Sequence, residues 1–314
     1  MMGFPAARLT DLTSHISLVG AMCGVIGALP LPSAAMAGAM AGAMALQIPT
    51  GVVTAPCFPP VIVGFLPSAR VLDLHACSID LPLPNTITTG SSTVLIGGLP
   101  AARISDKTFC SAEVSTGMPN VLIGGPVVVF PINIHGDIAF VKNVQQSMAT
   151  LYGTPSGKAI LAGIAGKNNT VTIVPTNAQN GYCGATNQAD SMNPAKGSSS
   201  TVSWNPSYSI PSDPTSTPTI VLGHELVHAY HNGTGTAKNG PHDSYAGQTG
   251  TSDRGEERAT VGCGGTSVVT PAGTPAVVPD HSADVPTENS IRDDLGVARR
   301  PTYYPSNWPG GPPW

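Results

Sequence analysis

The chain has 314 residues, of which 41% are hydrophobic, and its formal net charge is −4. This length suits two domains of ordinary size, and the apolar fraction is enough for packed cores and argues against wholesale disorder. The 14 Lys and Arg residues form no basic tract, which excludes the concentrated positive surface that DNA- or RNA-binding proteins need.

The cysteines and the N-terminus indicate where the protein is made. Six cysteines are spread thinly along the chain, unlike the dense framework of a disulfide-stabilised domain. The first residues, MMGFPAARLTDLTSH, contain no basic region leading into an apolar one, so no cleaved signal peptide is expected. We therefore expect synthesis in a reducing cytoplasm and, if the protein is secreted, export by a route without a signal peptide.

The first part of the chain contains three related segments. They are GFPAARLTDLTSH from Gly3, GFLPSARVLDLHAC from Gly64 and GGLPAARISDKTFC from Gly97. Alternating Val, Leu and Ile residues come before the later copies, in PPVIVGFLP and SSTVLIGGLP, and stand alone in MPNVLIGGP. Alternation followed by a glycine turn predicts β-hairpins, and their repetition predicts that they stack, with a plain β-meander as the alternative.

An apolar insertion, at about residues 17–50, separates the first two copies. No Asp, Glu, Lys or Arg occurs from Leu12 to Ala69, and SAAMAGAMAGAMALQI from Ser33 to Ile48 predicts a helix rich in small residues. This helix is shorter than the roughly 20 residues that span a bilayer. Two interpretations stay open: a helical hairpin that is buried or covered by a partner, and membrane contact through residues 17–48.

Histidine and cysteine residues follow the repeated turns at equivalent places. Stacking of the repeats would bring these ends together, where His and Cys side chains suit a closed structural zinc site. A narrow tip has little core of its own, so a bound metal would help to hold its shape. The residues are His15, His75, Cys77 and Cys110.

The words PAARLTD, PSARVLD and PAARISD resemble PAAR-repeat proteins, over residues 1–127. Those proteins are conical caps on the VgrG spike trimer of the type VI secretion system, so the resemblance implies a β-repeat cone over residues 1–130 that binds that spike. It also implies His15, His75 and Cys110 as metal ligands. A fourth ligand, usually histidine, would fall near Asn85, and we expect Cys77 to take its place.

The polarity and the hydrophobic pattern of the sequence change near residues 130–140, where we place the domain boundary. From Asp137 the chain is more polar, and residues 138–164 predict two helices that break near Gly153 and Pro155. NTVTIVPT and TVSWNPSYSI predict strands, joined by the loop GATNQADSMNPAKGSSS. The second half therefore reads as an α+β domain.

The string TIVLGHELVHAYHNGTG holds a candidate metal site. His224 and His228 stand four residues apart, which places both imidazoles on one face of a helix, about 5–6 Å apart at Cβ. Two such imidazoles can bind one Zn²⁺, and Glu225 would lie beside the open coordination position. There its carboxylate can take a proton from zinc-bound water and pass it to the leaving amine.

A third metal ligand is available downstream in SDRGEERATVG. Ser252 or Asp253 can cap a helix there, and Glu256 and Glu257 fall 28 and 29 residues after His228. This gap is long enough for a loop and a returning helix. One glutamate can complete a site of two histidines and one glutamate, and the other can hold a ligand imidazole by a hydrogen bond.

The combination HELVHAYH…EERATVG resembles zinc metallopeptidases related to clostridial neurotoxin light chains and to NleD-type bacterial effectors, over residues 137–305. The resemblance implies a zincin-like metallopeptidase, followed by a Pro/Gly-rich tail at 306–314. It implies Zn²⁺ ligation by His224, His228 and Glu257. Glu225 would be the catalytic base, and Glu256 would support a ligand.

The resemblance also suggests an Arg-x-x-Tyr pair that stabilises the oxyanion of the tetrahedral intermediate. In ENSIRDDLGVARRPTYYP, Arg300 and Tyr303 have that spacing, and Arg292 is an alternative. These side chains could instead pack the C-terminal tail. His231 and His242 are interpreted as bystanders, because the helix already has its two ligands.

Together the halves predict a type VI secretion effector: a zinc endopeptidase toxin, carried on the VgrG spike, that cleaves a protein of the target cell. An immunity protein and a chaperone for the apolar insertion are possible further partners. Two alternative functions stay open: a non-enzymatic spike-tip protein, and a membrane-inserting toxin that uses residues 17–48. Metal binding in the second half separates the first function from the non-enzymatic one.

Overall fold

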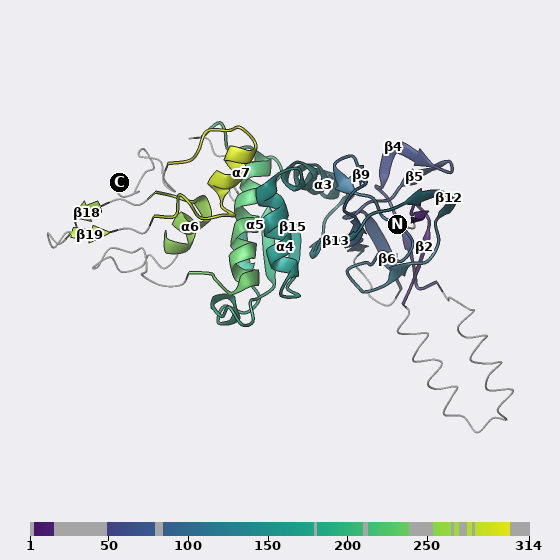
Figure 1. The fold of residues 1–314 in the computed structure, drawn as a ribbon, viewed down its shortest axis with the longest axis horizontal. Coiled ribbons are helices and arrows are strands. Elements are labelled where there is room, and N and C mark those ends of the chain that lie inside the picture. The colour runs from purple at the N-terminus through teal and green to yellow at the C-terminus, as the bar shows by residue number, and fades with distance from the viewer. Residues whose placement is uncertain are drawn as a thin grey trace, which may run out of the picture. The chain divides into compact units, whose positions relative to one another are not determined.

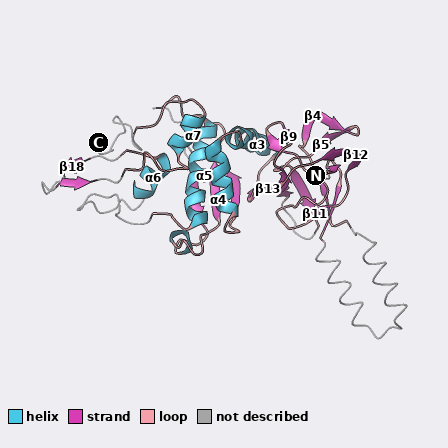
Figure 2. Cartoon of the chain, in the orientation of Figure 1, coloured by secondary structure: helices cyan, strands magenta, loops and turns pink. Residues whose placement is uncertain are grey.

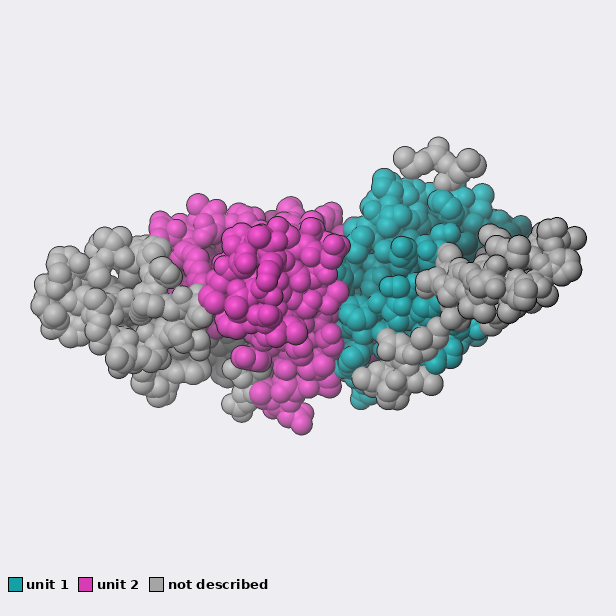
Figure 3. Space-filling view, turned by 90° about the horizontal axis from the view of Figure 1, so that it is seen from below, with its two compact units in different colours: residues 1–138 teal, residues 139–314 magenta. Residues whose placement is uncertain are grey.

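The computed structural model describes residues 3–15, 49–78, 84–178, 181–209, 213–238, 254–264, 267–269, 275–277 and 280–301. The expected apolar insertion at 17–48 lies outside the described residues. The chain forms two compact units, Met1–Ile138 and Ala139–Trp314 (Figure 3). Strands dominate the first unit, and helices cover a small sheet in the second (Figure 2).

The first unit is built from short antiparallel strands. The largest sheet has the order β11-β2-β3-β6-β7. The pairings of β4 with β5 and of β9 with β10 correspond to predicted hairpins, whereas β12, in MPNVLIGGP, pairs with β1 from the distant start of the chain. The strands are β1 (Phe4–Ala6), β2 (Leu12–Ser14), β3 (Gly51–Val53), β4 (Phe58–Val63), β5 (Leu66–Ser68), β6 (Leu74–Cys77), β7 (Asn85–Thr86), β8 (Thr89–Ser91), β9 (Leu95–Ile96), β10 (Leu99–Pro100), β11 (Glu113–Val114), β12 (Met118–Ile123), β13 (Val127–Val129) and β14 (Ile132–Ile134).

A closed ring of backbone hydrogen bonds joins the three repeats. Ala7 donates to the carbonyl of Ala102 at 3.0 Å, Ala102 donates to Ala69 at 3.0 Å, and Ala69 donates back to Ala7 at 2.9 Å. All three alanines are fully buried. The repeats therefore meet around a pseudo-threefold axis. Each contributes to it the alanine that precedes the arginine of its Pro-Ala-Ala-Arg or Pro-Ser-Ala-Arg segment.

The arginine and aspartate of each repeat form the same turn three times. The pairs are Arg8–Asp11 at 3.0 Å, Arg70–Asp73 at 3.3 Å and Arg103–Asp106 at 3.0 Å. In the first two repeats the aspartate also accepts the arginine backbone N–H at 2.7 Å, so the side chain closes the turn from within. This geometry explains why each repeat has an aspartate three residues after its arginine.

The second unit has a sheet with β17 between β15, which is parallel to it, and β16, which is antiparallel. Its elements are α3 (Ile138–Tyr152), α4 (Pro155–Ala165), β15 (Val171–Pro175), β16 (Tyr182–Ala185), η1 (Asp190–Met192), β17 (Ser200–Trp204), α5 (Pro218–Thr234), α6 (Arg254–Val261), β18 (Ser267–Val269), β19 (Pro275–Val277) and α7 (Glu288–Asp294). The segment 184–200 was expected to be a loop, but it begins within β16, whose small residues pair with the β-branched strand β17.

Helix α5 is the centre of the second unit, with α4 beside it (Figure 1). Thr217 caps its N-terminus, Pro218 is its first residue, and Gly235 ends it with φ of 75°. Most of its residues are buried against α4, α7 and the sheet, so the helix is fixed by packing from several sides. Among the described residues, no helix combines the length and apolar character needed to cross a bilayer.

Candidate metal centre and active site

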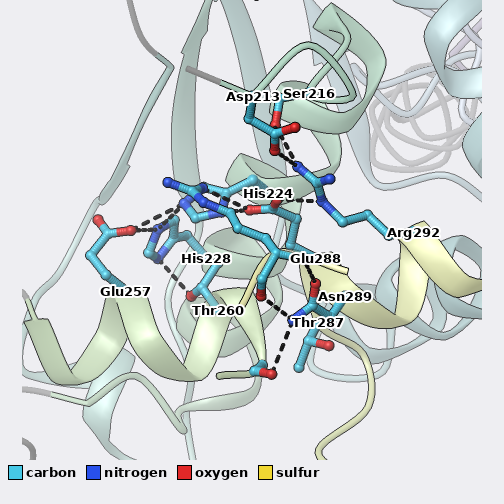
Figure 4. Close-up of polar contacts among 12 residues, drawn as sticks. Asp213, Ser216, His224, His228, Glu257, Thr260, Thr287, Glu288, Asn289 and Arg292 are labelled. Atoms are coloured by element: carbon cyan, nitrogen blue, oxygen red, sulfur yellow. Dashed lines mark hydrogen bonds and ion pairs between the residues drawn. The ribbon is translucent and has the colours of Figure 1, made fainter. Parts of the chain in front are cut away.

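Three side chains from two helices converge on one point. Helix α5 supplies His224 and His228, and the first turns of α6 supply Glu257 (Figure 4). The two Nε2 atoms lie 3.2 Å apart, and Glu257 Oε2 lies 3.1 Å from that of His224 and 3.3 Å from that of His228. The structure thus brings together the three residues that the sequence analysis selected as metal ligands.

This triangle fits a metal ion. Ligand atoms bound tetrahedrally to Zn²⁺ at 2.0–2.1 Å lie about 3.3 Å from one another. The donor set of two imidazole nitrogens and one carboxylate oxygen also suits Zn²⁺. These residues could therefore hold one metal ion after only small adjustments.

Each ligand imidazole is oriented through its other nitrogen. Nδ1 of His224 donates to Glu288 Oε2 at 2.8 Å, and Nδ1 of His228 lies 3.2 Å from Glu256 Oε1. Ionised carboxylates only accept hydrogen bonds, so each Nδ1 carries a proton and each Nε2 points to the centre. Once Nε2 is deprotonated, both histidines would offer a lone pair to an ion at that point.

The carboxylates give the site its charge. Burial by itself would lower the pKa of His224, but hydrogen bonds to Glu257 and Glu288 raise it to about 9. Burial would likewise raise the pKa of Glu288, but His224, Arg300 and Arg292 lower it to about 2. The buried acids therefore stay ionised and attract positive charge to this point, either as protons on the imidazoles or as a cation between them.

Glu225 lies beside this centre on α5 and is only 6% exposed. Burial raises the pKa of its carboxyl group, which favours a group that exchanges protons. Gly181, just before β16, approaches this side chain so closely that a Cβ there would stand 2.5 Å from both Cγ and Oε1 of Glu225. The start of β16 therefore limits where the carboxylate can lie.

Glu256 belongs to the surroundings of the triangle. Its Oε1 lies 2.6 Å from Nδ1 of His231 and 3.2 Å from Nδ1 of His228, and its Oε2 accepts the backbone N–H of Lys238 at 2.7 Å. His231, interpreted as a bystander, thus anchors the carboxylate that orients a candidate ligand. His242, the other expected bystander, lies outside the described residues.

The two candidate arginines have different environments. Arg300 Nη1 lies 3.2 Å from Glu288 Oε2, so its guanidinium lies next to the carboxylate that holds His224. Arg292 is fully buried, and its donors point to Glu288 and to the segment before α5. Arg292 is therefore poorly placed to meet a substrate, whereas Arg300 is closer to the centre. Tyr303 and Tyr304 lie outside the described residues.

The sequence analysis did not identify Glu288, Asn289, Asp213 or Gly181. Glu288 follows the helix cap Thr287, where an acidic residue is ordinary, so its role as partner of His224 had no local signal. Asn289 accepts the Arg300 N–H at 2.7 Å and donates to the Arg300 carbonyl at 2.9 Å and to the Gly262 carbonyl at 3.1 Å. Such contacts depend on the tertiary fold and not on spacing.

A second cluster lies in the first unit. His15, Cys77 and Cys110 offer ligand atoms that all lie within 4.8 Å of one another. His75 is fully buried next to them, with Nδ1 3.8 Å from the Cys110 sulfur and Nε2 2.5 Å from Thr13 Oγ1. Burial and the neighbouring His15 lower its pKa to about 4, so its imidazole is neutral.

Asn85, at the position where a fourth histidine was considered, takes part in other contacts. Its Oδ1 accepts a hydrogen bond from Asn133 Nδ2 at 3.3 Å. Of the four residues expected at the repeat ends, His15, Cys77 and Cys110 form the described donor group, and His75 is not part of it.

Two family models match the chain. The model of the Peptidase M91 family, described as "Effector protein", matches residues 130–303. The PAAR-motif model matches twice, over residues 47–116 and 86–137. No curated protein matches the chain. Both resemblances carried by the sequence motifs are confirmed by these matches, since the M91 family is the NleD-type family.

Proposed function

Because the chain belongs to the M91 peptidase family of effector proteins, with a PAAR module before the peptidase domain, we propose that it is a zinc-dependent endopeptidase toxin of the type VI secretion system. The observation that carries the proposal is the triangle of His224 Nε2, His228 Nε2 and Glu257 Oε2, with sides of 3.1–3.3 Å. Zn²⁺ is the ion whose ligand chemistry matches this set best.

The metal and the residues around it would have distinct roles in peptide hydrolysis. A bound zinc ion would supply Lewis-acid polarisation of the scissile carbonyl and acidify water. Glu225 would take up a proton at its carboxylate and return it to the leaving amine, for which its raised pKa is suited. Glu288 and Glu256 would hold the ligand imidazoles in one tautomer.

Arg300 would donate to the carbonyl oxygen of the substrate as negative charge develops there. Its backbone is held by Asn289 and its guanidinium already contacts Glu288, so it would need little reorganisation. Tyr303, three residues later, stays a proposal for the same role by the resemblance.

The PAAR module would carry the enzyme on the VgrG spike. Its three strand pairings expose equivalent apolar side chains, among them Ile62, Leu95 and Leu122. A surface that repeats itself about a pseudo-threefold axis suits a trimeric partner, because each repeat can meet one subunit in the same way. The cluster of His15, Cys77 and Cys110, with His75 beside it, would hold a structural zinc ion.

The proposal extends to the cellular context. The protein would be made in a bacterial cytoplasm and delivered by the type VI secretion system into a target cell, with a protein of that cell as substrate. A chaperone for residues 17–48 and an immunity protein are further proposed partners.

The test uses the full-length protein and its Glu225→Ala variant. Both are expected to bind zinc in the second unit, and only the unchanged protein should generate new N-termini in the proteome of a target cell. Equal sets of new N-termini would remove Glu225 as the base. A protein that binds no zinc in the second unit would remove the metallopeptidase proposal itself.

A further inference from the structure

Arg292 lies near the candidate centre, and its guanidinium donates hydrogen bonds in several directions. It is fully buried on α7, and a guanidinium has five N–H groups in a rigid fork. Five acceptors surround it: Glu288 Oε1 at 2.7 Å, Thr215 Oγ1 at 2.8 Å, the Ala298 carbonyl at 3.0 Å, Asp213 Oδ2 at 2.7 Å and Ser216 Oγ. The charge is thus enclosed between two carboxylates, Glu288 and Asp213.

On one side Arg292 fixes the partner of a candidate metal ligand. Glu288 is 1% exposed and uses its two oxygens for different tasks. Oε1 accepts from Arg292 Nε, and Oε2 accepts from Nδ1 of His224 at 2.8 Å. Because a carboxylate is rigid and planar, holding Oε1 in place limits where Oε2 can lie, and Oε2 in turn orients the imidazole.

On the other side Arg292 reaches the segment that begins the ligand helix. Asp213 lies four residues before Thr217, the N-cap of α5. Its Oδ1 accepts the Thr215 N–H at 3.0 Å, and its Oδ2 accepts from Ser216 Oγ at 2.8 Å. The same carboxylate therefore shapes the turn before α5 and binds Arg292, as the dashed lines around Asp213 show (Figure 4).

These contacts form one chain from a partly exposed acid to a candidate ligand, Asp213–Arg292–Glu288–His224. We infer that Arg292 and Asp213 are positioning residues that set the metal affinity of the centre, acting on His224 through Glu288. The inference rests on the proposed metal site, and it adds to that site a remote determinant, Asp213, eleven residues before His224.

The alternative is that the network only stabilises the fold. Asp213 and Arg292 join the start of α5 to α7, so their loss would also lower the free energy of unfolding. The two roles differ in how changes combine. A residue that acts through Glu288 has no further effect on metal affinity once Glu288 can no longer hold His224, whereas independent effects add in free energy.

The experiment measures Zn²⁺ affinity of the second-unit site by chelator competition, in the full-length protein. The variants are Asp213→Asn, Glu288→Gln and the double variant. Asp213→Asn nearly preserves shape, and the partly exposed position of Asp213 favours a folded protein. We expect about 10–100-fold weaker binding for Glu288→Gln, as for other partners of metal-bound histidines, and a smaller loss, at the lower end of that range, for Asp213→Asn.

Asp293→Asn is the matched control. Asp293 lies next to Arg292 on α7 and pairs with Arg299, and both side chains are about half exposed. Within the part of the chain that the structure describes, the contacts of this pair do not include a candidate metal ligand. This variant should bind Zn²⁺ as the unchanged protein does. Thermal unfolding of the metal-free proteins separates an effect on zinc affinity from an effect on stability. Arg292→Lys keeps the positive charge but loses the planar guanidinium, and it should weaken Zn²⁺ binding as Asp213→Asn does.

Three outcomes are decisive. A double variant that binds Zn²⁺ no more weakly than Glu288→Gln supports the inference. Unchanged affinity in Asp213→Asn, or losses that multiply in the double variant, would overturn it while leaving the metal site intact. Absence of Zn²⁺ binding by the unchanged second unit would instead overturn the proposed function on which the inference rests.

Discussion

Gly181 lies against the side chain of Glu225, at a distance that leaves no room for a Cβ atom. An added Cβ would stand 2.5 Å from Cγ and Oε1 and 2.8 Å from Cδ of the glutamate. The base proposed from the HELVH motif is therefore placed by two separate parts of the chain: its own helix and the residue that precedes β16. The position of the proposed base should therefore be sensitive to any side chain added at Gly181.

We predict that Gly181→Ala lowers the rate of substrate cleavage by about 10²-fold, because a displacement of about 1 Å at a reacting group has that cost. Zinc affinity should stay near that of the unchanged protein, since no ligand is contacted. Kinetics on the substrate found by proteomics, together with chelator competition, check both parts.

Gly184→Ala, within the strand that Gly181 precedes, is the control. The three atoms nearest to a Cβ at Gly184 all belong to the Tyr182 side chain, with Cε1 at 3.1 Å. Its activity should stay close to normal. An active Gly181→Ala enzyme would show that Glu225 can do its work from another position.

The two adjacent glutamates of α6 are predicted to differ in their effect on the metal. Glu257 Oε2 faces both Nε2 atoms, whereas Glu256 Oε1 faces Nδ1 of His228 and of His231. Glu257→Ala removes a ligand and should abolish stoichiometric zinc in the second unit. Glu256→Ala should keep the ion with about 10–100-fold weaker affinity. The reverse order in a metal analysis would exchange their assigned roles.

The residues that the sequence could identify share one property, namely that their chemistry shows in local spacing. His224 and His228 reveal a shared helix face, and the three Pro-Ala-Ala-Arg or Pro-Ser-Ala-Arg words reveal a repeat. The ring of Ala7, Ala69 and Ala102 explains the repeat afterwards, because only a small side chain fits where three backbones meet.

The residues that the sequence could not identify act over long separations. Glu288 reaches His224 from 64 residues away, and Asp213 reaches Arg292 from 79 residues away. An acidic residue in the first turn of a helix, or before a helix cap, has an ordinary local explanation. Only packing of α7 against α5 shows that these acids belong to one network.

The alanine ring leads to a prediction about stability. Ala69→Val adds two methyl groups at the fully buried junction of the three repeats and should lower the free energy of unfolding by about 1–3 kcal/mol. Ala76→Val, at a half-buried position on β6, should change it by less than about 1 kcal/mol. Denaturant unfolding of the first-unit transition measures both, and equal effects would show that the ring tolerates larger residues.

The cluster of the first unit predicts a second zinc ion, which can be lost without loss of the zinc ion in the second unit. Cys110→Ser removes one donor of the group His15, Cys77 and Cys110, so zinc per chain should fall from about two to about one, and the first unit should unfold at lower temperature. Cys57→Ser is the control, because its thiol lies outside that group and donates to the Thr54 carbonyl at 3.4 Å.

The same metal analysis can identify the fourth donor. His75 Nδ1 is 3.8 Å from the Cys110 sulfur, and its neutral imidazole could turn toward an ion. If it ligates, His75→Asn should release zinc from the first unit as Cys110→Ser does. If it only packs there, with Nε2 against Thr13 Oγ1, His75→Asn should keep that zinc. Two zinc ions in Cys110→Ser would contradict the structural metal site altogether, while leaving the centre on α5 and α6 untouched.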